Sequence, residues 1–141
     1  MFSRILVAID EEGHAAHAVK AGAEMAVRFH CPLVLLTVLG NAGLTEELEQ
    51  LAHDEGLYVG EITQRILDEA AATARRMGVT DIVRLDEEGD PAETILDAAL
   101  ANKADLIVMG AHAIEPHEDL IHTSVSHQVM ARAACPCLIV R

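Results

Sequence analysis

Apolar residues in this chain fall into short continuous runs, which alternate with longer segments where apolar and polar positions are mixed. A short run without regular polar positions predicts a strand that is buried on both faces of a sheet. We therefore predict buried strands over residues 3–9, 32–39, 81–85, 105–109 and 137–140.

The longer segments repeat their apolar residues with the 3.6-residue period of an α-helix. They predict helices over residues 13–28, 61–77 and 124–133, and another that begins at Asp90-Pro91. Asp90 and Ser124 are residue types that cap a helix N-terminus, and Gly78 suits a helix C-terminal end. In the helix that follows Asp90, the residues expected to face the core are Ile95, Leu96, Ala99 and Leu100.

Alternating helices and buried strands predict an α/β fold, a doubly wound five-stranded parallel sheet flanked by helices. No repeat, low-complexity tract or linker divides the sequence, so we expect one domain over residues 1–141. Ligands of such sheets bind at the carboxyl ends of the strands, near the point where the strand order reverses. The segments in which to search for a site are therefore 10–17, 38–43, 87–91 and 110–127.

The charge balance excludes several classes of partner. The chain has 10 Lys and Arg against 23 Asp and Glu, a formal net charge of −13. Such a field repels nucleic acids and anionic membranes, so we expect neither as a partner. No apolar run reaches the ~20 residues that cross a bilayer, and no signal peptide is evident. We therefore expect a cytoplasmic protein.

The cysteines Cys31, Cys135 and Cys137 are odd in number, which does not suit a framework of disulfides. Cys135 and Cys137 flank one residue at the start of a strand, a spacing that could bind a metal or support redox chemistry. Free cysteines are more often small buried hydrophobic residues, and we favour that interpretation for all three.

Five segments together resemble the universal stress protein family, in the family's order and at its spacing, over the whole chain. They are Ile5–Asp10, Asp90–Ala92, Ala104–Gly110, Thr123–Ser126 and Cys135–Val140. The resemblance implies a five-stranded parallel sheet of the adenine nucleotide α-hydrolase-like type and a homodimer that pairs through its last strand. The interface residues would be Pro136, Cys137, Leu138, Ile139 and Val140. An apolar strand at a sheet edge also favours pairing, because its backbone groups need partners.

The resemblance also implies a nucleotide site, since many members of the family bind ATP. Those members carry Gly-x-x-Gly, then nine residues, then Gly followed by Ser or Thr. They use an acidic residue after the first strand to hold the ribose and the backbone after the second strand to contact the base. The corresponding positions of this chain are Asp10, Val38, Gly110, Ala113, Thr123, Ser124 and Val125.

The phosphate-binding half of that pattern is altered. Ala113 and Thr123 stand where the family has glycine, and a Cβ at a positive-φ position costs on the order of 1–2 kcal/mol. No Lys or Arg lies between Lys103 and Arg132, whereas that stretch contains four acidic residues. The repulsion of ATP by the three of them that lie in the loop, Glu115, Glu118 and Asp119, amounts to about 2 kcal/mol after screening. We therefore expect weak or no ATP binding and no required cofactor. ATP or AMP binding, assisted by Mg²⁺, remains the alternative.

Histidines are concentrated in the same rim segments, at His14, His17, His112, His117, His122 and His127. With neighbouring carboxylates they suit Zn²⁺ or a similar metal, and the candidate ligands are His112, His117 and Glu118. No zinc motif of standard spacing is present, so a solvated polar rim is the simpler interpretation. We also find no catalytic constellation, because Ser124 and Ser126 lack a nucleophile elbow and Asp10 has no identifiable partner.

These observations predict a non-catalytic universal stress family protein. We expect a homodimer with a role in stress tolerance or protein interaction, through a protein partner that the sequence does not identify. An ATP or AMP binding switch and a metal-binding module that uses the rim histidines are the two alternatives.

Overall fold

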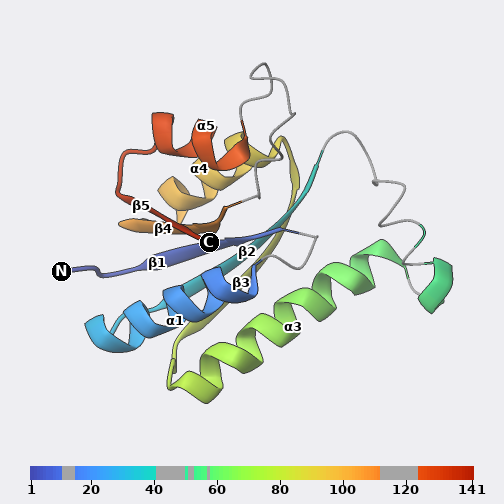
Figure 1. The fold of residues 1–141 in the computed structure, drawn as a ribbon, viewed down its shortest axis with the longest axis horizontal. Helices are drawn as coiled ribbons and strands as arrows, with labels where there is room; N and C mark the ends of the chain where they lie inside the picture. The colour runs from blue at the N-terminus through green and yellow to red at the C-terminus, as the bar shows by residue number, and fades with distance from the viewer. Residues whose placement is uncertain (11–14, 41–49, 51–52, 57, 112–123) are drawn as a thin grey trace.

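The five strands form one parallel sheet in the order β3-β2-β1-β4-β5 (Figure 1). The structure is a computed structural model and describes residues 1–10, 15–40, 50, 53–56, 58–111 and 124–141. The strands are β1 (Ile5–Ile9), β2 (Leu33–Gly40), β3 (Ile82–Gly89), β4 (Leu106–Gly110) and β5 (Cys137–Val140).

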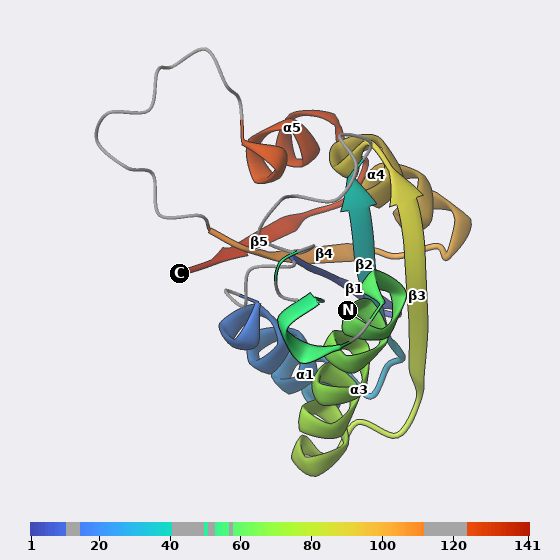
Figure 2. The same cartoon turned by 90° about the vertical axis from the view of Figure 1, so that its right-hand side faces the viewer.

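Helices cover both faces of the sheet. Helices α1 (Ala16–Phe29) and α3 (Val59–Met77) lie on one face, and α4 (Pro91–Ala101) and α5 (Val125–Arg132) lie on the other (Figures 1 and 2). The predicted doubly wound α/β architecture is therefore confirmed. No helix among the described residues combines the length and the apolarity that crossing a membrane needs.

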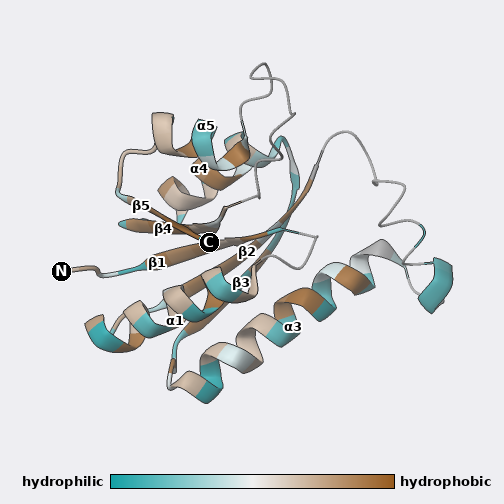
Figure 3. Ribbon diagram, viewed as in Figure 1, coloured by the Kyte–Doolittle hydropathy of each residue, from teal (hydrophilic) through white to brown (hydrophobic). Residues whose placement is uncertain are grey.

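Two apolar layers hold these elements together, one on each face of the sheet. Along β1, Ile5 and Val7 pack toward α1 and α3, whereas Leu6 packs toward α4. This alternation follows from the two-residue period of a strand, and it explains why β1 has no polar position: both of its faces are covered. The hydropathy colouring shows the same apolar character along the central strands (Figure 3).

The predicted helix ends are also confirmed. The Asp90 side chain accepts a hydrogen bond from the Glu93 backbone N–H at 3.0 Å, and Pro91 follows in the first turn of α4. Gly78 ends α3 with φ +107°, a left-handed conformation that glycine adopts without steric cost. Ser124 caps α5 by accepting from the His127 N–H at 3.2 Å.

The prediction that every strand is buried on both faces was wrong for the two edge strands. The inner strands β1, β2 and β4 are largely buried, whereas β5 is half-buried throughout and β3 is partly exposed. Strand β3 also continues to Gly89 instead of ending near Leu85, paired with β2 along its whole length. An edge strand needs a partner on one side only, so Asp86, Glu87 and Glu88 can face solvent while their backbone stays in the ladder.

One predicted core position of α4 is also wrong. Ile95 and Ala99 are buried and Leu96 packs against the same apolar layer, but Leu100 is 70% exposed. Leu100 directly follows the buried Ala98 and Ala99, and the step of about 100° per residue along the helix puts it on the outward face of α4.

Candidate functional site at the carboxyl edge of the sheet

The strand order reverses between β1 and β4, since β2 and β3 lie on one side of β1 and β4 and β5 lie on the other. Helices α1 and α5, the next described helices after β1 and β4, lie on opposite faces of the sheet (Figure 2). In this topology the helices that follow two adjacent strands diverge to opposite faces and leave a crevice at the carboxyl edge. Two described residues lie at this point: Asp10, which follows β1, and Gly110, the last residue of β4.

The sheet register brings three of the predicted site residues together. Ile9 pairs with Thr37 of β2, so the next residue of each strand, Asp10 and Val38, lie side by side. On the other side of β1, Ala8 pairs with Met109, which puts Gly110 next to Ile9. Asp10, Val38 and Gly110 thus lie on three neighbouring strands at one edge, and each is half-buried.

The start of α5 contributes the remaining described members of the set. Val125 and Val38 pack against the same apolar layer, which also contains Met109. The Ser124 hydroxyl accepts from the His127 N–H and lies 3.2 Å from the Ser126 hydroxyl. Both contacts stay within the first turn of α5, as expected of a cap.

A polar network next to Val38, which joins two buried threonines to the exposed Asp86, was not predicted. The Thr37 and Thr63 hydroxyls donate to the two carboxylate oxygens of Asp86, at 3.1 Å and 2.9 Å, and both threonines are almost fully buried. The network joins β2, β3 and α3 directly below the carboxyl edge and so holds the end of β2 in place. A threonine within the apolar run 33–39 was the only sequence signal for it.

A sequence model described as "Universal stress protein family" matches residues 1–141. The chain belongs to the universal stress protein family. A universal stress protein of Thermus aquaticus is 37% identical to it over 145 residues, with all of both chains covered. The fold therefore has the adenine nucleotide α-hydrolase-like architecture of this family.

Solved structures agree with this assignment. A universal stress protein in complex with cAMP superposes with a TM-score of 0.77 at 23% identity, over 99% of this chain and 97% of that one. An Archaeoglobus fulgidus universal stress protein in complex with dAMP gives 0.72 at 22% identity, over 99% and 98%. At these identities the likeness establishes the shared fold.

Several candidate residues of this universal stress protein lie outside the described part of the chain. They are Ala113 and Thr123 of the nucleotide pattern and His112, His117 and Glu118 of the candidate metal set. Within the described residues, no group of three or more His, Cys, Asp or Glu side chains is arranged to hold a metal ion.

The three cysteines are half-buried and free of disulfides. Burial raises the pKa of the Cys135 thiol, and the nearby Asp105 carboxylate raises it further. The same two causes raise the pKa of Cys31, and burial together with Cys135 raises that of Cys137. A raised pKa lowers the fraction of reactive thiolate, which supports a packing role for these side chains.

Proposed function

We propose that this universal stress protein is a non-catalytic homodimer that acts in stress tolerance or protein interaction and binds ATP weakly or not at all. The observation that carries the proposal is a mismatch between two halves of one site. Asp10 and Val38 match the adenosine half of the family pattern at one edge of the sheet, whereas the phosphate half keeps Gly110 and has lost its other two glycines, at Ala113 and Thr123.

Charge opposes a polyphosphate at this edge. The stretch that should cradle phosphates contains no Lys or Arg between Lys103 and Arg132, and it contributes Glu115, Glu118 and Asp119. ATP brings about four negative charges, so each added phosphate increases the repulsion that the site must overcome. The N-terminus of α5 alone offsets at most about 2 kcal/mol of it.

A structural role for Ser124 supports a non-catalytic function. Its hydroxyl is engaged by the His127 N–H and by Ser126, both within α5. A serine nucleophile instead needs a neighbouring base that can take its proton. No such base is paired with Ser124 among the described residues.

The position of β5 at the edge of the sheet formed by the described strands supports homodimerisation. Strand β5 pairs with β4 on one side, and its four residues are half-buried on both faces. An apolar edge strand with unpaired backbone groups is the kind of surface that a second copy of the chain covers. In the proposed dimer, Pro136 to Val140 of each protomer form the interface.

Binding of an adenine mononucleotide is the second candidate. Two proteins with this fold have been solved with cAMP and with dAMP, each of which carries one phosphate. A monophosphate would use Asp10 and Val38 and would bring fewer charges to the altered phosphate half.

Calorimetric titration with ATP, ATP plus Mg²⁺, and AMP tests the two candidates. We expect no measurable heat with about 1 mM ATP, with or without Mg²⁺. Restoring both glycines, in Ala113→Gly/Thr123→Gly, should strengthen ATP binding about tenfold or more. AMP binding that is lost in Asp10→Ala would favour the second candidate. A rise of several degrees in Tm at about 1 mM ATP would contradict the first.

A further inference from the structure

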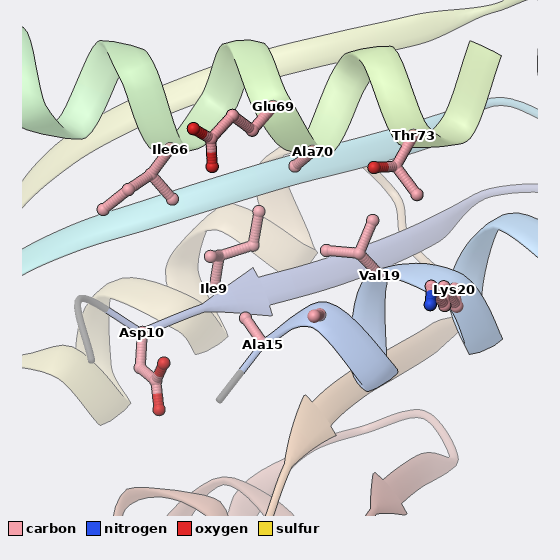
Figure 4. A pocket seen from close by; sticks show the side chains of 10 residues that line it. Ile9, Asp10, Ala15, Val19, Lys20, Ile66, Glu69, Ala70 and Thr73 are labelled. Carbon is pink, nitrogen blue, oxygen red and sulfur yellow. The ribbon is translucent and has the colours of Figure 1, made fainter. Parts of the chain in front are cut away.

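A cavity of about 210 Å³ lies between α1 and α3, above the end of β1 (Figure 4). Its floor is apolar: Ile9, Val19 and Ala70 line it and are only 6%, 3% and 7% exposed. Binding pockets for drug-sized molecules are typically ~300–1,000 Å³, so this cavity suits a smaller ligand.

Side chains of opposite charge line the cavity from its two helices. Lys20 comes from α1, while Glu69 and Thr73 come from α3, one helical turn apart (Figure 4). Thr73 accepts a hydrogen bond from the Arg76 guanidinium at 3.2 Å, and its hydroxyl can still donate its own hydrogen to a ligand.

Lys20 and Glu69 do not neutralise each other. Within the part of the chain that the structure describes, neither side chain makes a hydrogen bond or ion pair with another residue. In Figure 4, Lys20 and Thr73 lie toward one end of the cavity, with Val19 and Ile9 extending from them toward Asp10. A positive and a negative side chain therefore line the cavity without pairing with each other, above an apolar floor.

We propose that this cavity binds a small zwitterion with an apolar body, of the size and chemistry of a branched-chain aliphatic amino acid. Its carboxylate faces Lys20 and Thr73, its ammonium faces Glu69, and its side chain rests on Ile9, Val19 and Ala70. A ligand that carries both charges can pair with Lys20 and Glu69 at the same time, whereas a ligand with one charge can pair with only one of them, so the structure favours a zwitterion.

This site goes beyond the proposed function, because Lys20, Glu69 and Thr73 are not among the residues that match the family's nucleotide pattern. The cavity and the carboxyl-edge site share only Asp10. Variants of Lys20 and Glu69 therefore test the cavity without removing any candidate nucleotide contact.

The test is a titration of the full-length protein, followed by amide chemical shifts and by calorimetry. The probes are L-leucine, isopentylamine and 4-methylpentanoate, which share an apolar body and carry both charges, only the ammonium or only the carboxylate. We expect L-leucine to bind at least about tenfold more tightly than either analogue. Amides near Val19 and Ala70 should shift, and those of β5 should not.

Two matched variants and two controls assign the contacts. Lys20→Gln and Glu69→Gln should each weaken L-leucine binding at least about tenfold. The controls Lys103→Gln and Glu61→Gln carry the same changes on residues that do not line the cavity, and they should leave binding unchanged. Equal binding of the three probes would overturn the proposal. So would wild-type affinity in both cavity variants, or no shift at Val19 and Ala70 with saturating L-leucine.

Discussion

At the scale of single residues, Asp105 joins the starts of two central strands. It stands directly before β4, and its carboxylate accepts hydrogen bonds from the backbone N–H groups of Ser3 and Arg4, at 2.8 Å and 3.0 Å. Burial acts to raise the pKa of Asp105, but these backbone hydrogen bonds outweigh it and hold the pKa below its ordinary value. The Asp105 side chain thus holds the residues before β1 next to the residue before β4.

We expect Asp105→Ala to lower the free energy of unfolding by about 1.5 kcal/mol at pH 7, because hydrogen bonds to a charged acceptor are lost. Since the folded pKa is lowered, the contribution of Asp105 is present above the ordinary carboxyl pKa of about 4. It disappears as the pH falls through the folded value. Urea unfolding should show a smaller difference in the free energy of unfolding between wild type and Asp105→Ala at pH 3 than at pH 7. Asp97→Ala, at an exposed position of α4, is the control. If the destabilisation by Asp105→Ala were the same at pH 7 and pH 3, this account would be contradicted.

At the scale of elements, α1 packs directly against β1 at Gly22. Gly22, in the middle of α1, is buried, and a Cβ at this position would come within 2.3 Å of the Val7 Cγ2. Val7 is fully buried and has little room to move. The absence of a side chain at Gly22 is therefore what allows the helix to approach the sheet.

Gly22→Ala should therefore destabilise the protein by about 1–3 kcal/mol despite the better helix propensity of alanine, because the core becomes overpacked. Gly60→Ala is the matched change in α3, where nothing lies within 4 Å of the new Cβ. We expect it to be neutral or to stabilise by about 0.5 kcal/mol. Thermal and urea unfolding of both variants measure the difference, and equal effects would show that helix propensity rather than packing controls both sites.

At the scale of the whole molecule, the apolar edge strand β5 and the net charge of −13 act in opposite directions on association. The apolar edge favours a second copy of the chain, whereas two strongly acidic protomers repel each other. Salt screens that repulsion over about 8–10 Å near physiological ionic strength, without weakening apolar contacts.

We predict that sedimentation gives twice the 15.1 kDa chain mass and that the dimer strengthens as salt increases. Ile139→Asp should yield monomers, because it puts a charge on the half-buried strand at the proposed interface. Val83→Asp is the control, a similar change on a half-buried position of the other edge strand, and it should leave the dimer intact. A wild-type monomer at all salt concentrations would contradict the proposed interface.

The sequence alone determined the elements, their order and the family. Strand runs, the caps at Asp90 and Ser124 and the helix end at Gly78 depend on contacts within a few residues, so local patterns were sufficient to predict them. The resemblance supplied Asp10, Val38 and Gly110, and the register confirmed only that these three lie together at one edge. Only the tertiary structure decided which strands lie at the edges, how far β3 continues, that Leu100 is exposed, and that Lys20 and Glu69 line one cavity. Each of these depends on which distant segments pack side by side, and the periodicity of a single segment is the same whatever packs against it.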